Sequence, residues 1–292
     1  TLLGANTFAG GVTMNAGTLT LGNDSAAGSG SLRLNGGTVT TSGTRSIDNN
    51  IVLGGGSFGG ANNLTLNGVV SGGGTFNKSG AGTVALGNAN TASNSVSISG
   101  GKLSLDANGA LASVTSIALS GTGHLVLNSG GGNLVNDAAS LTFAGGSLDA
   151  NNRTEVFGGL SLNGGGNTIN LLNDGINGTL TFAGGNFVAG SLNIAGWVGQ
   201  DNLNVSPGGT GDRIFFSTLL SGSFLGAISF NGVPTGGFQL PSGELIPVPE
   251  PGTIAFLALG GAAPWRQASR PRAAWLRPAP PHPSQQSRPP PR

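Results

Sequence analysis

Carboxylates are spread thinly along the body of the chain, and they are the side chains most able to do chemistry. Two of them held close together can act as general acid and general base, for example in cleaving a glycosidic bond. Asp149, Arg153 and Glu155 are the densest group, and Glu155 could meet Asp137 across neighbouring segments. The spacing matches no specific catalytic pattern, and Asp is a preferred turn residue. We therefore interpret these acids as turn and loop residues: Asp24, Asp48, Asp106, Asp137, Asp149, Glu155, Asp174 and Asp201.

The other polar side chains indicate neither a nucleophile nor a metal site. His124 is the only histidine of the first 250 residues, and no serine–histidine–aspartate or metal-ligand spacing surrounds it. We interpret it as a surface strand residue. The segment 208–212 nearly matches a calcium-binding nonapeptide repeat, but Asp212 falls one place early and such sites need stacked copies. Glycine runs such as 72–74 precede no helix, which argues against phosphate binding. We expect no metal and no cofactor.

The composition is far from that of an average globular domain. Glycine contributes 56 of the 292 residues, only 8% of residues are charged, and tyrosine and cysteine are absent. Typical domains have ~7% glycine and ~25% charged residues. An apolar fraction of 37% argues against a disordered chain, and the glycines lack the every-third-residue period of collagen. Without cysteine, disulfides and thiolate metal sites are excluded.

Charge is divided unevenly between the body and the end of the chain. Residues 1–250 carry six Lys or Arg against eleven Asp or Glu, a net charge of 6 − 11 = −5. Residues 251–292 carry six Arg and no acid, a net charge of +6. The body has no basic face of the kind that nucleic-acid binding needs, so we expect no nucleic-acid partner.

Short alternations of apolar and small polar residues, broken by Gly, Asn and Ser, dominate the first 196 residues. Leu-Thr-Leu at 19–21 and 64–66 and Leu-Ser-Leu at 103–105 are examples. Alternate residues of a strand point to opposite faces, so each triplet puts two apolar groups inward. Strands this short cannot stabilise a separate hairpin, but they form a continuous core when successive turns of chain stack. The pattern predicts a solenoid, in which Asn side chains can form hydrogen-bonded ladders.

An internal repeat supports this prediction. The segment 5–21 recurs at 89–105, an offset of 84 residues without a gap. Both copies begin with Ala-Asn-Thr, continue with an apolar–polar–apolar triplet, and end with Gly-x-Leu-x-Leu. From Trp197 onwards bulkier side chains appear, and a solenoid needs a cap over its exposed cross-section. We expect that cap at 197–247, with a short helix near 217–227.

The chain ends in three parts: Val-Pro-Glu-Pro at 248–251, an apolar run at 252–263, and then arginines. Apolar residues followed by positive charge are typical of a membrane anchor. This ending resembles the PEP-CTERM sorting signal of Gram-negative and allied bacteria. The resemblance implies export, transient membrane contact, processing by an exosortase-type enzyme, and association with biofilm and extracellular polysaccharide. It assigns the sorting motif to Val248, Pro249, Glu250 and Pro251, and the basic flank of the anchor to Arg266, Arg270 and Arg272.

Two further segments resemble proteins of this kind. Residues 4–23 are similar to the autotransporter-associated β-strand repeat, and 211–216 followed by 242–247 are similar to a segment that often precedes such a tag. The anchor departs from the pattern, because an apolar run of this length falls short of the ~20 residues that span a bilayer. Pro264 interrupts it, and a Pro/Arg-rich tail follows, which we expect to be disordered. A reading-frame shift near 263 would explain this ending, and sequencing the source locus would test it. The N-terminus opens inside a strand-like pattern, which favours a fragment of a longer protein.

These observations predict an all-β chain: a right-handed parallel β-helix or β-solenoid at 1–196, a cap at 197–247, a sorting signal at 248–272 and a disordered tail at 273–292. The function they favour is structural or adhesive, in an exported protein of the bacterial surface or extracellular matrix that is not an enzyme. Two alternatives remain. One is a carbohydrate-active β-helix enzyme, which would need Asp137, Asp149 and Glu155 within catalytic reach. The other is an autotransporter passenger, which would need a C-terminal membrane barrel.

Overall fold

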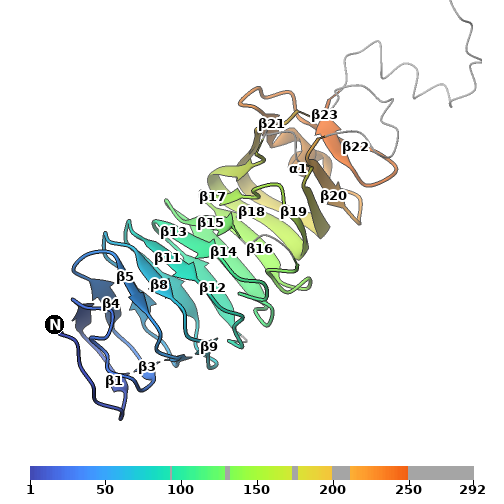
Figure 1. Cartoon of the computed structure of the whole chain (residues 1–292). Coiled ribbons are helices and arrows are strands. Elements are labelled where there is room, and N and C mark those ends of the chain that lie inside the picture. Colours follow the sequence, from blue (N-terminus) through green and yellow to red (C-terminus); the bar gives the residue numbers. More distant parts are fainter. Residues whose placement is uncertain (93, 129–131, 173–176, 199–210, 249–292) are drawn as a thin grey trace, which may run out of the picture.

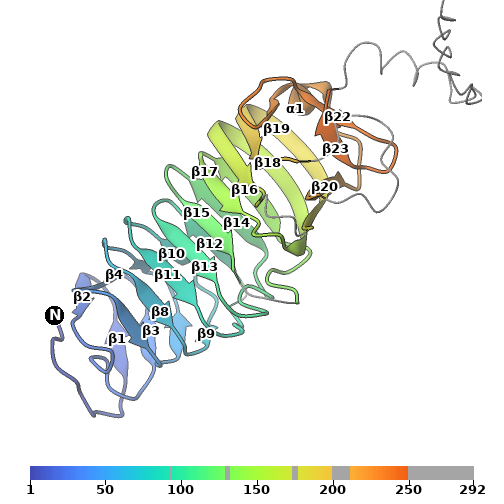
Figure 2. The same cartoon turned by 45° about the horizontal axis from the view of Figure 1, so that its top comes forward.

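A computed structural model describes residues 1–92, 94–128, 132–172, 177–198 and 211–248. The chain forms an elongated stack of strands, with the N-terminus at one end and the segment 211–248 at the other (Figure 1). Parallel strands wind through about eight turns, which confirms the predicted all-β parallel solenoid. Successive turns lie one above the next along the stack (Figure 2).

The strands fall into three columns, which we call the first, second and third stacks. The first stack contains β1 (Val12–Met14), β3 (Leu32–Leu34), β6 (Ile51–Leu53), β9 (Val70–Ser71), the starts of β18 (Thr154–Asn170) and β19 (Thr179–Ala195), and β20 (Arg213–Phe216). The second contains β2 (Thr18–Leu21), β4 (Thr38–Thr41), β7 (Ser57–Phe58), β10 (Phe76–Lys78), β12 (Ser95–Ile98), β14 (Ser116–Ser120), β16 (Ser140–Ala144) and the middle of β18 and β19. The third contains β5 (Arg45–Ile47), β8 (Leu64–Leu66), β11 (Thr83–Leu86), β13 (Lys102–Leu105), β15 (His124–Leu127), β17 (Gly146–Asp149), the ends of β18 and β19, and β21 (Ile228–Phe230).

The apolar residues of each triplet form the core. In β8, Leu64 and Leu66 are buried while Thr65 between them is half-buried, and most strands repeat this alternation. Each fully buried Leu, Ile, Val or Phe side chain contributes ~1.5–3 kcal/mol relative to its exposed state. The stack gives every strand the neighbours that its two inward residues need.

Glycine is required at the corner between the first and second stacks. Gly17, Gly37 and Gly56 occupy this corner in three successive turns, each with φ of 80°. A Cβ atom on Gly37 would lie 2.5 Å from the carbonyl oxygen of Gly17 in the turn before. Positive φ and close backbone approach both exclude larger residues, and a corner of this kind in each turn helps to explain the glycine content.

The 84-residue sequence repeat does not coincide with the period of the solenoid. Four turns lead from Thr18 through Thr38, Ser57 and Asn77 to Ser97, an offset of 97 − 18 = 79 residues. An offset of 84 residues leads instead into β13, in the third stack. The repeat therefore aligns strands of different stacks, because strands of all three stacks share one local pattern.

Asparagine side chains tie neighbouring turns together, mostly through the backbone. Asn35 Nδ2 donates to Asn15 Oδ1 at 2.9 Å, as expected for a ladder. By contrast, the buried Asn90 accepts from Val70 N at 2.7 Å and donates to Ala110 O at 2.9 Å, so its amide bridges the turns on either side. Such bonds satisfy backbone groups where the chain bends between strands.

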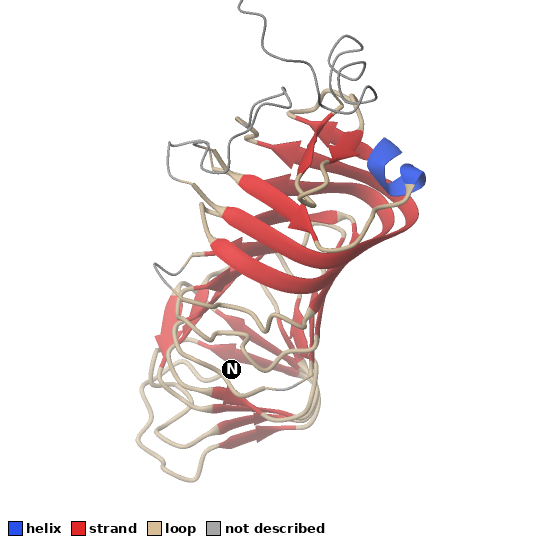
Figure 3. Ribbon diagram, turned by 90° about the vertical axis from the view of Figure 1, so that its right-hand side faces the viewer, coloured by secondary structure: helices blue, strands red, loops and turns tan. Residues whose placement is uncertain are grey.

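The last part of the described chain differs from the regular turns. After β20 come α1 (Gly222–Gly226), β21, and the antiparallel pair of β22 (Gly237–Gln239) and β23 (Leu245–Pro247). The short helix lies within the range predicted for it, against the long strands at this end (Figure 3). β20 and β21 continue the parallel stacks, so the segment expected as a cap supplies one more turn before the antiparallel pair. Within the described ranges no helix has the length and apolar character to span a membrane.

Candidate functional site

The C-terminal end of the solenoid is closed by an aromatic ladder. Phe157, Phe182 and Phe216 come from successive turns of the first stack, with ring centroids 5.3 and 5.2 Å apart. Phe224 of α1 meets Phe216 edge-on at 5.6 Å. All four side chains are almost completely buried. The helix therefore places the ring of Phe224 over the end of the core, where another turn of the solenoid would otherwise pack.

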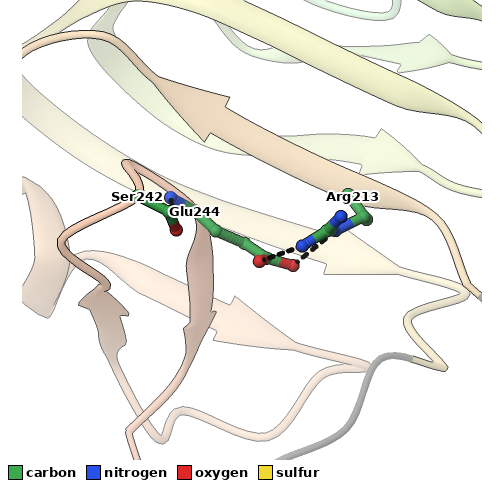
Figure 4. Close-up of polar contacts among 3 residues, drawn as sticks. All are labelled: Arg213, Ser242 and Glu244. Atoms are coloured by element: carbon green, nitrogen blue, oxygen red, sulfur yellow. Dashed lines mark hydrogen bonds and ion pairs between the residues drawn. The ribbon is translucent and has the colours of Figure 1, made fainter. Parts of the chain in front are cut away.

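An ion pair fastens the antiparallel pair to the last turn. Arg213 of β20 donates from Nε and Nη2 to the two carboxylate oxygens of Glu244, at 2.9 and 2.6 Å (Figure 4). The hydrogen bonds from Arg213 to Glu244 raise the pKa of the guanidinium above its ordinary value, against the effect of burial. Arg213 also lies over the ring of Phe215, 4.9 Å from its centroid. Fork-shaped pairs of this kind fix geometry as well as adding energy.

Backbone contacts extend this fastening. Phe215 and Glu244 form an antiparallel bridge, and Phe216 N donates to Gly243 O at 2.9 Å. The side chain of Ser242 accepts from Glu244 N at 3.4 Å. These contacts join the segments 211–216 and 242–247, which the sequence comparison had paired only by resemblance to a closing segment.

Of the residues predicted to form the sorting motif, the structure describes only Val248. Val248 directly follows β23, is 40% exposed, and donates from its backbone N–H to Gly236 O at 3.2 Å. The other residues predicted for the signal lie outside the described residues: Pro249, Glu250, Pro251, Arg266, Arg270 and Arg272.

Of the three carboxylates that could have formed a catalytic group, Asp137 lies near enough to Glu155 for its charge to act on it, but Asp149 and Glu155 belong to different stacks. Asp149 ends β17 in the third stack, and its Oδ2 lies 2.8 Å from His124 Nε2. Burial would raise the pKa of Asp149, but the contacts with His124 and Asn170 and the charge of Lys102 together lower it below the ordinary value. The pair is a cross-turn contact between neighbouring strands. The sequence did not predict it, because the two residues are 25 positions apart.

Glu155 occupies a different place, at the start of β18 in the first stack. It is 2% exposed, and its carboxylate accepts from the backbone N–H groups of Leu134, at 3.1 Å, and Val135, at 2.9 Å. Burial raises its pKa, with a further contribution from the charge of Asp137, and the two backbone hydrogen bonds oppose this rise. Glu155 therefore serves the backbone of the preceding turn, in a stack that does not contain Asp149.

The remaining described acids have local partners. Asp106 accepts from Ser104 at 2.5 Å and from Asn128 at 3.0 Å, and Asp212 accepts from Gly178 N at 2.6 Å. Asp24, Asp48 and Asp137 also accept hydrogen bonds, from Ser46 N, Asn67 and Asn133. Asp174 and Asp201 lie outside the described residues, as do 208–210 of the calcium-like segment. Across the described part of the chain, no three His, Asp or Glu side chains gather in a group able to hold a metal ion.

The most unusual buried group is a lysine that sequence reasoning passed over. Lys78 ends β10 in register with the buried Phe58 and Ile98, and it is only 1% exposed. Its Nζ donates to three carbonyl oxygens, those of Ser79, Gly80 and Gly100, each at 2.9 Å. Burial lowers its pKa to about 8. The sequence does carry a signal for this site. Lys78 ends the triplet Phe-Asn-Lys at 76–78, at a position where the other triplets place an inward apolar residue.

These features define the class of protein as a parallel β-solenoid with a fastened C-terminal end. Comparison with protein-family models, with characterised proteins and with solved structures finds no match to the chain.

Proposed function

We propose that the chain is a structural or adhesive protein of the bacterial surface or extracellular matrix, exported and without catalytic activity. The observation that supports this is the stack itself. About eight turns form one continuous parallel solenoid, and each turn adds ~4.8 Å of length. Such a body is extended and offers long side faces, which suits a spacer or an adhesive surface. The fold is compatible with this role.

The outward face of the second stack supports an uncharged polymer as partner. Its strands β2 to β16 present hydroxyl, amide or methyl side chains outward, and neighbouring turns are joined through them. The Oγ1 atoms of Thr20 and Thr40 are 3.1 Å apart, and Thr38 Oγ1 lies 2.9 Å from Ser57 Oγ. Hydroxyl groups held in rows can exchange hydrogen bonds with a sugar chain, so we propose extracellular polysaccharide as the partner.

The C-terminal signal supports sorting to the cell surface. In the proposed route, an exosortase-type enzyme cuts near Pro249–Pro251, after transient membrane contact through 252–263. Val248 supports this, because it directly follows β23 and is 40% exposed, so a cut just after it would fall outside the antiparallel pair. Cleavage there would leave the fastened end of the solenoid intact.

The test is mass spectrometry of the mature C-terminus in surface and soluble fractions of the native cells. We expect surface-located protein that ends near Pro249–Pro251. The variant Glu250→Ala should block this processing, whereas Asp24→Asn, at the other end of the stack, should not. Surface protein that still ends at Arg292 would remove the processing claim. Protein confined to the cytoplasm would remove the proposed function.

A further inference from the structure

Six asparagines of the chain directly precede a glycine: Asn35, Asn67, Asn108, Asn163, Asn177 and Asn231. This pair of residues is open to a spontaneous reaction, because a glycine nitrogen can approach the side-chain amide without hindrance from a Cβ atom. The nitrogen attacks Cγ, a C–N bond forms, and ammonia leaves. Water then opens the resulting succinimide ring to give aspartate or isoaspartate.

Four of these amides are held by hydrogen bonds to neighbours, and a fifth asparagine also has an interaction partner. Asn67 Nδ2 donates to Asp48 Oδ1 at 2.8 Å and to Ser46 Oγ at 3.0 Å. Asn231 accepts from Trp197 N at 3.0 Å and donates to Trp197 O at 2.9 Å, as a paired strand would. The other three residues are Asn35, which donates to Asn15, Asn177, which accepts from Gly211 N, and Asn108, which also has a partner.

Asn163 is different. Its side chain is exposed, and no residue that the structure describes forms a hydrogen bond with it. It lies in β18 between two register shifts, where the pairing with β19 is interrupted on both sides. Gly164 follows with φ of 144°, and a Cβ atom there would meet nothing within 4 Å. The space around the reacting groups is open.

We propose that Asn163 is the site at which the folded protein deamidates, while the other five Asn–Gly pairs are protected by the fold. The reaction needs only water and replaces a neutral amide with a carboxylate. An isoaspartate product also adds one methylene group to the backbone. The irregular pairing between Asn163 and Gly166 leaves room for that extra length, so the solenoid on either side stays paired. The proposal does not depend on export or processing.

The experiment compares the six sites within one chain. Folded and denatured protein are incubated in parallel at mildly alkaline pH in water labelled with heavy oxygen, and the six peptides are followed by mass spectrometry. Each hydrogen bond that must first break slows the reaction by roughly fivefold. In the folded protein we expect Asn163 to react about five- to thirtyfold faster than any other site. In the denatured chain the six rates should approach one another.

Asn163→Gln is the matched variant, and it should remove the fast product without changing the slow ones. Circular dichroism of this variant shows whether the fold is kept. The proposal is overturned when another Asn–Gly pair reacts as fast as Asn163 in the folded protein. It is equally overturned when Asn163 stays intact in the folded protein while the denatured chain reacts.

Discussion

Raising the pH from 7 to 9.5 should stabilise this protein, through Lys78. The pKa of Lys78 is lowered from 10.5 to about 8 in the folded chain. Below pH 8 the amine is charged in both states. Between pH 8 and 10.5 the folded chain releases its proton while the unfolded chain keeps it, so the unfolded state binds more protons and stability rises with pH. At about 1.4 kcal/mol per unit, pH 9.5 gives an increase of up to ~2 kcal/mol.

Few other groups titrate in this pH window. The chain has no tyrosine and no cysteine, and its only other lysine is the exposed Lys102. The assay is urea denaturation at several pH values between 7 and 9.5. Lys102→Met should keep the rise in stability, and Lys78→Met should remove it. Carbon NMR of the two lysines in the native chain gives the pKa of Lys78 directly, whether or not Lys78→Met folds. A stability that stays flat or falls over this range would refute the reasoning.

Three further comparisons test a corner glycine, the aromatic ladder and the ion pair. In urea denaturation, Gly37→Ala should lower the free energy of unfolding by ~1–3 kcal/mol more than Gly17→Ala. Both glycines have φ of 80°, but only a Cβ atom on Gly37 meets a carbonyl oxygen, at 2.5 Å. Equal losses of unfolding free energy would contradict this. Phe182→Ala should lower the unfolding free energy by ~3–5 kcal/mol and Phe182→Leu by under ~1.5 kcal/mol, because Phe182 stacks between two rings. Similar losses for the two variants would argue against the ladder. Glu244→Gln should lower the unfolding free energy by ~1–3 kcal/mol and speed amide hydrogen exchange in β22 and β23. An unchanged exchange rate would show that the Arg213–Glu244 ion pair does not hold β22 and β23 against the last turn.

The sequence predicts the solenoid well because its signal is local. A triplet such as 64–66 carries its own inward and outward faces, and the glycines between triplets mark the corners. The stack to which a strand belongs is a long-range property that no triplet encodes. The 84-residue repeat shows this, since it matches a strand of the first stack to one of the second. Register is set by corners that differ in length from turn to turn, and their lengths are not visible in the alternation.

Polar contacts between turns were harder to predict for the same reason. His124 and Asp149 are 25 positions apart, and Arg213 and Glu244 are 31 apart. The first pair belongs to no recurring motif, and the second joins two segments that the sequence pairs only by resemblance to a closing segment. The first pair follows from the parallel register of β15 and β17, and the second from the antiparallel bridge between Phe215 and Glu244.

Departures from the repeat are therefore the places to look for function in such a chain. A residue that obeys the pattern contributes to the stack, and its identity is interchangeable with that of its neighbours above and below. Lys78 breaks the pattern between Phe58 and Ile98, and Glu155 breaks it opposite Leu180. Each places a charge where the neighbouring turn is apolar. Lys78 donates hydrogen bonds to backbone carbonyl oxygens, and Glu155 accepts hydrogen bonds from backbone N–H groups. Because a buried charge costs free energy unless it is well bonded, these sites fix turns that short triplets alone would leave free to slip.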